Sequence, residues 1–105
     1  SEESLNTVDN KPKTISLVCT ENVSKERFHQ FLQEVLPDCY RIKGFFLLDH
    51  CWTQVDVVEE LIDYKPCPKK EISELVFLSK VGPKVIRSID EAWKKTMDNP
   101  MKLKN

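Results

Sequence analysis

The segment from residue 40 to residue 58 constrains the fold of this chain more than any other. Near its start Ile42 stands between two bases, a pattern that places this residue on one strand face and the bases on the other, and a run of four apolar residues follows after Gly44. Residues 51–58 alternate in the same way. The dipeptide Asp49-His50 separates the two runs, which predicts a hairpin, although the turn lacks the glycine of the strongest hairpin signals.

The rest of the chain predicts two helices that pack on this hairpin and further strands that extend its sheet. Ser24 is a favourable N-cap for a first amphipathic helix that Pro37 ends, and Gly82-Pro83 begins a second helix. The run from residue 55 to residue 62 is also compatible with a helix. The expected strands outside the hairpin cover residues 14–20, 59–64 and 75–78, and the expected helices cover residues 23–36 and 82–96, with stripes formed by Phe28, Leu32, Val35 and Leu36 and by Val85, Ile86, Ile89 and Trp93.

This order of elements predicts an α+β fold in two layers. We expect a largely antiparallel or mixed sheet of four to five strands, packed against the two amphipathic helices. Residues 1–13 are polar without periodicity and read as a disordered leader or linker, and residues 14–96 form one domain. Residues 97–105 read as a flexible tail.

Charge and cysteine content limit the function classes. The net charge of -1 gives no bulk attraction to nucleic acid or to an anionic membrane. No apolar run approaches the roughly 20 residues that span a bilayer, and the acidic first residues do not resemble a secretory signal. None of the four cysteines stands in a Cys-x-x-Cys pair, so we expect free thiols and a cytoplasmic location.

Catalytic and metal-binding motifs are sparse. With only two glycines the chain cannot contain a phosphate-binding loop, and its two histidines have no convincing nucleophile beside them, so we expect no enzymatic activity. His50, Cys51 and Cys67 supply three zinc or cobalt ligands if the proline-rich loop folds back on the hairpin turn. The alternative is a buried Cys51 that acts as a small hydrophobe, with the other two residues solvated.

Three residues of the hairpin are candidates for an interaction surface. Arg41 and Lys43 share one strand face, where they can bind an anion or pair with the acids at positions 59 and 60. Trp52 falls on the face opposite the apolar set. It is a contact anchor if it is exposed and part of the core if a helix covers it.

The segment Arg41-Ile42-Lys43-Gly44-Phe45 resembles the Arg-x-Lys-Gly-aromatic strand of the C-terminal domain of the CobW family of GTPases. A second similarity is Glu74-Leu75-Val76-Phe77-Leu78 before a helix, and the first strand and helix also look like the start of that domain. The resemblance covers residues 14–96. Ser79 stands where the family usually has glycine, and the segment 49–72 does not align with the family pattern.

The resemblance implies an indirect role. Full-length family members look like metal chaperones and insertases that couple GTP hydrolysis to delivery of zinc, cobalt or similar metals, including steps related to cobalamin biosynthesis. The GTPase domain of the family, with its phosphate loop and Cys-x-Cys-Cys motif, is absent from this sequence. The resemblance therefore predicts a non-catalytic interaction or regulatory module whose partner is a CobW-type GTPase domain or a metalloprotein client. The alternative hypothesis is a stand-alone zinc- or cobalt-binding protein that uses His50, Cys51 and Cys67.

Overall fold

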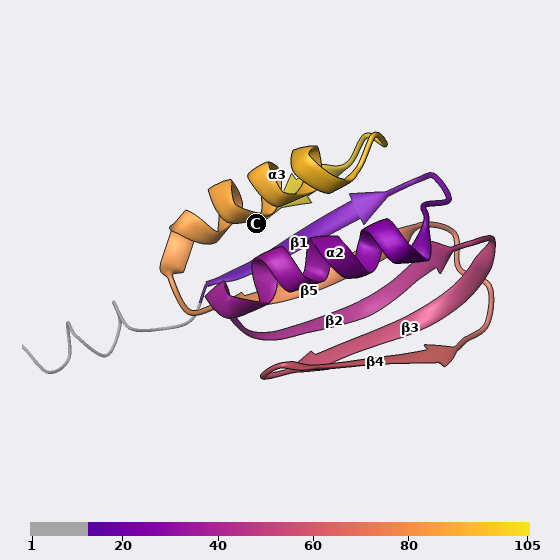
Figure 1. The fold of residues 1–105 in the computed structure, drawn as a ribbon, viewed down its shortest axis with the longest axis horizontal. Helices are drawn as coiled ribbons and strands as arrows, with labels where there is room; N and C mark the ends of the chain where they lie inside the picture. The colour runs from indigo at the N-terminus through magenta and orange to yellow at the C-terminus, as the bar shows by residue number, and fades with distance from the viewer. Residues whose placement is uncertain (1–12) are drawn as a thin grey trace, which may run out of the picture.

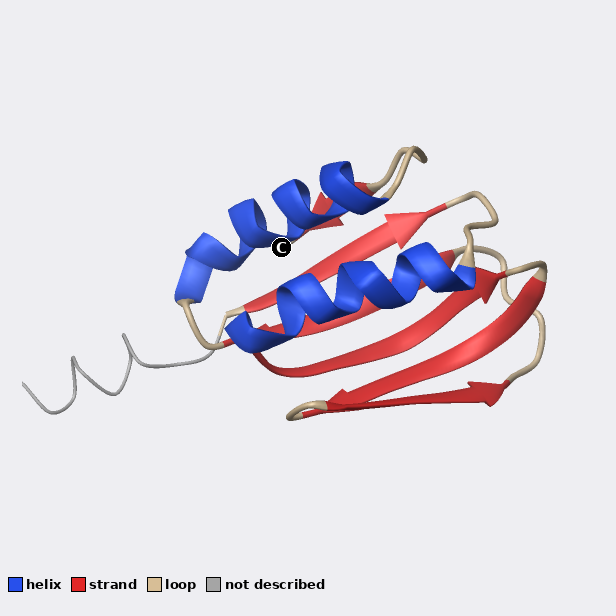
Figure 2. Ribbon diagram, viewed as in Figure 1, coloured by secondary structure: helices blue, strands red, loops and turns tan. Residues whose placement is uncertain are grey.

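The computed structural model describes residues 13–105, which form one sheet with two helices on one of its faces (Figure 1 and Figure 2). The leader expected over residues 1–13 lies outside the described residues, apart from Lys13. In chain order the elements are β1 (Thr14–Cys19), α2 (Lys25–Val35), η1 (Leu36–Asp38), β2 (Cys39–Leu48), β3 (Cys51–Val58), β4 (Leu61–Pro66), β5 (Ser73–Ser79), η2 (Gly82–Lys84), α3 (Val85–Thr96) and β6 (Lys102–Lys104).

The sheet has the strand order β4-β3-β2-β5-β1-β6, and every neighbouring pair is antiparallel. The prediction of an α+β fold with a largely antiparallel sheet is confirmed, and the run from residue 55 to residue 62 contains strand. The predicted number of strands, four to five, was wrong, because the described part of the chain contains six. The sixth is β6, in which Leu103 lies opposite Leu17 and is partly buried against the core. This strand replaces part of the tail that was expected to be flexible.

The hydrophobic core lies between the helices and the sheet. Phe28, Phe31 and Trp93 meet in it, and the Phe31 and Trp93 rings form an edge-to-face pair with centroids 5.2 Å apart. Each such buried aromatic side chain contributes about 1.5–3 kcal/mol to stability. The buried residues that face the helices come from four strands: Ile15, Leu17, Cys19, Cys39, Ile42, Phe46, Leu48, Val55, Val57, Leu75 and Phe77.

The hairpin turn holds the N-terminus of α2. Both Asp49 and His50 adopt positive φ, at 48° and 66°, as expected for a tight two-residue turn. A carboxylate oxygen of Asp49 accepts a hydrogen bond from the backbone N–H of Lys25 at 3.1 Å, and the N-cap Ser24 accepts one from Arg27 N–H at 3.3 Å. The turn therefore satisfies an otherwise unpaired donor of the first helical turn.

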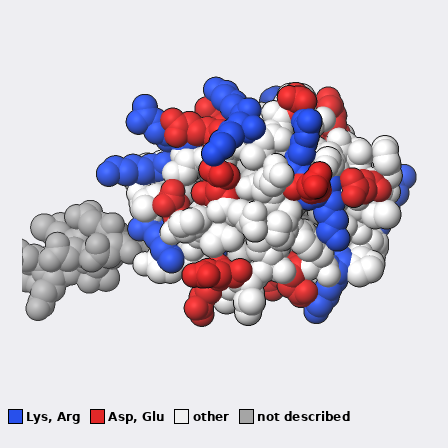
Figure 3. Space-filling view, viewed as in Figure 1, with Lys and Arg blue, Asp and Glu red and all other residues white. Residues whose placement is uncertain are grey.

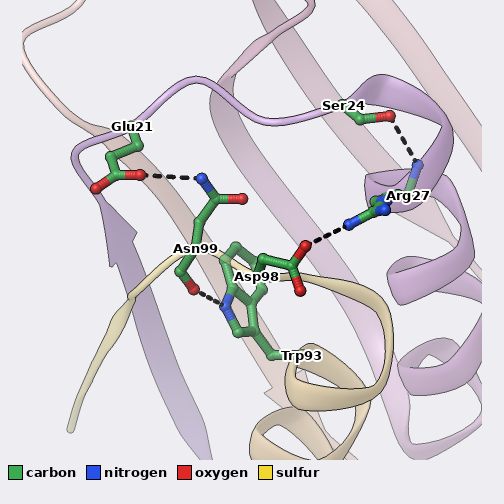
Figure 4. Close-up of polar contacts among 6 residues, drawn as sticks. All are labelled: Glu21, Ser24, Arg27, Trp93, Asp98 and Asn99. Atoms are coloured by element: carbon green, nitrogen blue, oxygen red, sulfur yellow. Dashed lines mark hydrogen bonds and ion pairs between the residues drawn. The ribbon is translucent and has the colours of Figure 1, made fainter.

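The chain after α3 is held by side-chain contacts that lead it toward β6 (Figure 4). The indole N–H of Trp93 donates to the backbone oxygen of Asn99 at 2.6 Å, and the Asn99 amide donates to Glu21 at 3.0 Å. Arg27 on α2 forms an ion pair with Asp98 at 2.9 Å. These contacts connect the end of α3 to the β1–α2 loop, and they explain why this polar segment takes a defined path.

Two local predictions need correction. The second helix begins at Gly82 as expected, with the 3₁₀ turn η2, but Ile86 is 37% exposed rather than part of the buried stripe, where Ala92 lies instead. Strand β4 extends to Pro66, which the sequence placed in a loop. Because β4 is an edge strand, the missing N–H of this proline costs no sheet hydrogen bond on the side away from β3. None of the helices within residues 13–105 has the length and apolar character needed to cross a bilayer.

Candidate functional site

Within residues 13–105, one face of the sheet has no helix packed on it, and we call the side chains on that face the open face. Because α2 and α3 lie on the same side of the sheet (Figure 1), alternate residues of every strand point to the opposite side. The strand register assigns the open-face residues of the four strands from β3 to β1: Trp52, Gln54, Asp56 and Val58; Arg41, Lys43, Phe45 and Leu47; Glu74, Val76 and Leu78; and Thr14, Ser16 and Val18.

The predicted face assignments of the interface candidates are confirmed by this register. Arg41 and Lys43 share the open face, while Ile42 between them is fully buried on the helix side. Trp52 pairs with Leu47 and lies on the same face. It is half-buried, so it is neither covered by a helix nor fully exposed.

Arg41 forms an ion pair with Asp56, not with the acids at positions 59 and 60. Its Nη2 lies 3.2 Å from both carboxylate oxygens, and its Nε lies 3.3 Å from one of them. The two side chains are 47% and 35% exposed, so a pair of this kind contributes at most about 1 kcal/mol. Asp56 lies directly opposite Lys43 in the register, yet its carboxylate is engaged by Arg41 on the neighbouring row.

A loop after β4 crosses the open face and forms a pocket there. The backbone N–H of Cys67 donates to the Trp52 carbonyl at 3.1 Å, which fixes the loop to β3. Farther along, Lys70 Nζ lies 4.7 Å from the ring centroid of Phe45, within cation–π range. The pocket between loop and sheet has a volume of about 470 Å³, and its lining includes three cationic side chains and one carboxylate: Arg41, Lys43, Lys70 and Asp56.

The backbone geometry at position 44 explains why glycine follows Lys43 in β2. The φ of Gly44 is +156°, and a Cβ at this position would overlap the carbonyl oxygen of Glu74 on β5. Only glycine permits this close approach of the two central strands. The residue thus sets the spacing of the sheet directly beneath the pocket, between Lys43 and Phe45.

The structure does not bring His50, Cys51 and Cys67 together as a metal-binding group. The backbone N–H of His50 donates to Asn22 at the turn, and Cys51 is exposed at the start of β3, on the opposite face from Trp52. Cys67 lines the pocket on the open face. Throughout residues 13–105, no three His, Cys, Asp or Glu side chains lie close enough to hold a metal ion.

The remaining cysteines and the second histidine belong to the helix side. Burial raises the pKa of the Cys19 thiol, and it raises the pKa of Cys39 to about 12, so neither is a nucleophile at neutral pH. His29 on α2 is partly buried, and its Nδ1 lies 2.8 Å from the hydroxyl of Tyr64. Burial raises the pKa of this tyrosine to about 12.

Sequence reasoning missed the contribution of Lys70 and Phe45 to the site. Phe45 was within reach of that reasoning, since it alternates with Arg41 and Lys43 along one strand. The position of Lys70 depends on the path of a loop that spans two strands, and the lysine pair that follows Pro68 carries no sequence signal for such a path.

Comparisons with known proteins give a fold and a family. Two solved structures of the GTPase YjiA, one of the zinc-bound E. coli protein and one of a zinc-bound triple mutant, superpose with TM-scores of 0.66 and 0.68. Identity is 16% in both cases, and each match covers 90% of this chain and 32% of that chain, so this chain spans about a third of their length. No protein with a curated description matches the sequence. The family profile described as the cobalamin synthesis protein cobW C-terminal domain matches residues 13–96, and the chain therefore belongs to the CobW C-terminal domain family.

Proposed function

We propose that this domain is a non-catalytic interaction or regulatory module that acts together with a CobW-type GTPase domain in metal trafficking. In this proposal the open face of the sheet is the docking surface, and the partner is the GTPase domain or a metalloprotein client. Zinc or cobalt is the cargo of the complete system, including metal insertion related to cobalamin. The role of this domain is to hold the partner.

The observation that carries the proposal is the composition of the open face. Arg41 and Lys43 lie on the central strand β2, and half-buried Trp52 and Leu47 form a cross-strand pair at its other end. Strand geometry places Lys43 about 14 Å and Arg41 about 20 Å along β2 from the Leu47–Trp52 pair. Protein interfaces combine aromatic and arginine side chains with an apolar centre and a polar rim, and this face presents the same combination.

Membership in the CobW C-terminal domain family supports the proposal that the partner is a GTPase domain. Family membership rests on residues 13–96, which include nearly the whole described sheet and both helices. The two solved structures are of a zinc-bound GTPase that is about three times as long as the matched segment, so in those proteins this fold accompanies a larger remainder. Association with a GTPase and with metal delivery follows for this chain as a proposal.

Calorimetric titration of the 105-residue chain with a purified CobW-type GTPase domain tests this function. We expect binding that Trp52→Ala weakens by about 2 kcal/mol, or roughly 30-fold, if the indole is buried at the interface centre. Arg87→Ala is the matched control, because Arg87 is 85% exposed on α3, on the other side of the sheet. The absence of binding to the GTPase domain in both its GDP and GTP states, and to metalloprotein clients, would refute the proposal.

A further inference from the structure

The pocket on the open face holds more positive charge than its own carboxylate can balance. Strand register places Asp56 opposite Lys43, but the Asp56 carboxylate is engaged by Arg41 at 3.2 Å. Within residues 13–105 neither Lys43 nor Lys70 has a carboxylate within salt-bridge distance. The other carboxylate on the open face near the pocket, that of Glu74 opposite Phe45, lies 3.8 Å from Lys104. On the helix side acidic and basic side chains are interspersed (Figure 3), and pairs such as Lys95–Glu34 form at 3.2 Å.

The geometry of the pocket directs these two lysines toward the same space. Lys43 rises from the central strand β2, and Phe45 is the next residue on the same face. Lys70 is held above the Phe45 ring by its cation–π contact at 4.7 Å. The prolines on either side of Cys67 restrict the loop, and the bond from its N–H to Trp52 fixes the start of the loop.

The two lysines favour an anionic group in the pocket. The floor of the pocket is apolar, and this feature indicates what kind of molecule carries that anionic group. Phe45 and Val76 line it beneath the lysines. Beyond the pocket the open face continues with the half-buried Leu47 and Trp52. A ligand that fills the pocket and follows this surface needs an anionic group on an aliphatic stem, together with apolar neighbours on an extended backbone. Glutamate among apolar residues provides these features, whereas a free phosphate provides only the charge.

We propose that this pocket binds a glutamate or aspartate side chain from an acidic, partly apolar segment of the docking partner. The carboxylate lies between the ammonium groups of Lys43 and Lys70, and the stem of the side chain packs on Phe45. This inference rests on the proposed docking function and specifies the chemistry of the partner segment. Arg41 and Asp56 border the site as an ion pair that is already satisfied.

The test uses a fluorescein-labelled peptide in which glutamate alternates with leucine, and a second peptide with glutamine in place of glutamate. Fluorescence anisotropy with the 105-residue chain should show that the glutamate peptide binds about tenfold more tightly, and that added salt reduces this difference. Lys43→Gln and Lys70→Gln should each weaken binding of the glutamate peptide about tenfold. Lys84→Gln is the control, because Lys84 is exposed beside α3, away from the pocket.

Equal binding of the two peptides, or an equal effect of the Lys84 control, would overturn the proposal. A further arm titrates inorganic phosphate and follows backbone amide shifts. Phosphate that shifts Lys43 and Lys70, without binding of the glutamate peptide, would also overturn it, since the site would then serve a free anion. If the GTPase domain binds and both lysine variants bind it normally, only this inference fails. If the glutamate peptide binds and no GTPase domain or client does, the docking function fails instead.

Discussion

At the scale of single residues, Gly44 connects the family motif to a physical requirement. The Arg-x-Lys-Gly-aromatic pattern places the glycine where the β5 backbone leaves no room for a Cβ, and the following aromatic residue forms part of the floor of the pocket. Gly82 is a natural comparison. Its φ is +62°, yet a Cβ there would meet no atom within 4 Å.

Gly44→Ala should therefore destabilise the domain far more than Gly82→Ala. The first substitution adds a clash with backbone to an unfavourable φ, and we expect a loss of about 3 kcal/mol or more. The second adds only the cost of a left-handed alanine, about 1 kcal/mol. Urea denaturation followed by tryptophan fluorescence measures both values. Equal losses in the two variants would show that β2 and β5 separate readily at this position.

The separation of His50, Cys51 and Cys67 leads to a second prediction at this scale. Titration of the reduced chain with Co²⁺ should give no thiolate-to-metal charge-transfer band that depends on these residues, because Cys51 lies on the helix side of β3 and Cys67 lies in the loop on the open face. The double variant Cys51→Ser, Cys67→Ser serves as the reference. A tetrahedral cobalt spectrum that this variant loses would support the metal-binding hypothesis over the docking proposal.

At the scale of elements, the β2–β3 turn also serves helix α2. Asp49 has positive φ and accepts a hydrogen bond from the first helical N–H. Asp49→Ala should cost about 2 kcal/mol, roughly half from the lost cap and half from the left-handed backbone. Asp49→Asn keeps both the acceptor and the tolerance for this φ, so it should cost less than half as much. Thermal unfolding followed by circular dichroism compares the two, and indistinguishable midpoints would exclude a capping role.

Strand β6 allows a test at one edge of the sheet. Removing residues 102–105 deletes the partner of Ser16, Leu17 and Val18 on β1. We expect amides of β1 that face β6 to exchange with solvent faster, while amides between β2 and β3 stay protected. Hydrogen–deuterium exchange read by NMR measures this difference. Unchanged exchange along β1 would mean that β6 contributes no lasting protection to this edge.

The sequence predicted elements whose signals are local, and it missed those that depend on distant pairing. The alternation around Ile42 and the N-cap Ser24 each depend on a few neighbouring residues, and both are observed. Strand β6 has only three residues, two of them lysines, and its sole apolar member Leu103 becomes informative only when β1 lies beside it. The same limit applies to the site, since alternation assigns the face of Lys43, whereas the place of Lys70 depends on a loop that crosses the sheet.

At the scale of the whole molecule, the two layers of the fold have different uses. The helix layer completes the core, and its aromatic side chains are buried. Among the described residues, one loop lies over the opposite side of the sheet, where it covers part of β2 and β3 and forms the pocket. A fold built in this way can vary its open face with little effect on the core. Docking variants such as Lys43→Gln should accordingly leave the unfolding free energy within about 0.5 kcal/mol of the original.

Stability at alkaline pH tests how tightly the helix layer packs against the sheet. Burial raises the pKa of Cys39 from 9.0 to about 12 and that of Tyr64 from 10.0 to about 12. For each group the pKa in the folded state lies above the pKa in the unfolded chain. At a pH between these two pKa values the folded state therefore binds more protons than the unfolded chain. Their contribution to stability is complete below pH 9 and is lost as the pH rises toward 12. Urea unfolding at a series of pH values should show this decline, and it should be less steep in Cys39→Ala, which lacks the first titrating group. A free energy of unfolding that stays constant from pH 9 to pH 11.5 would mean that water reaches both groups in the folded state.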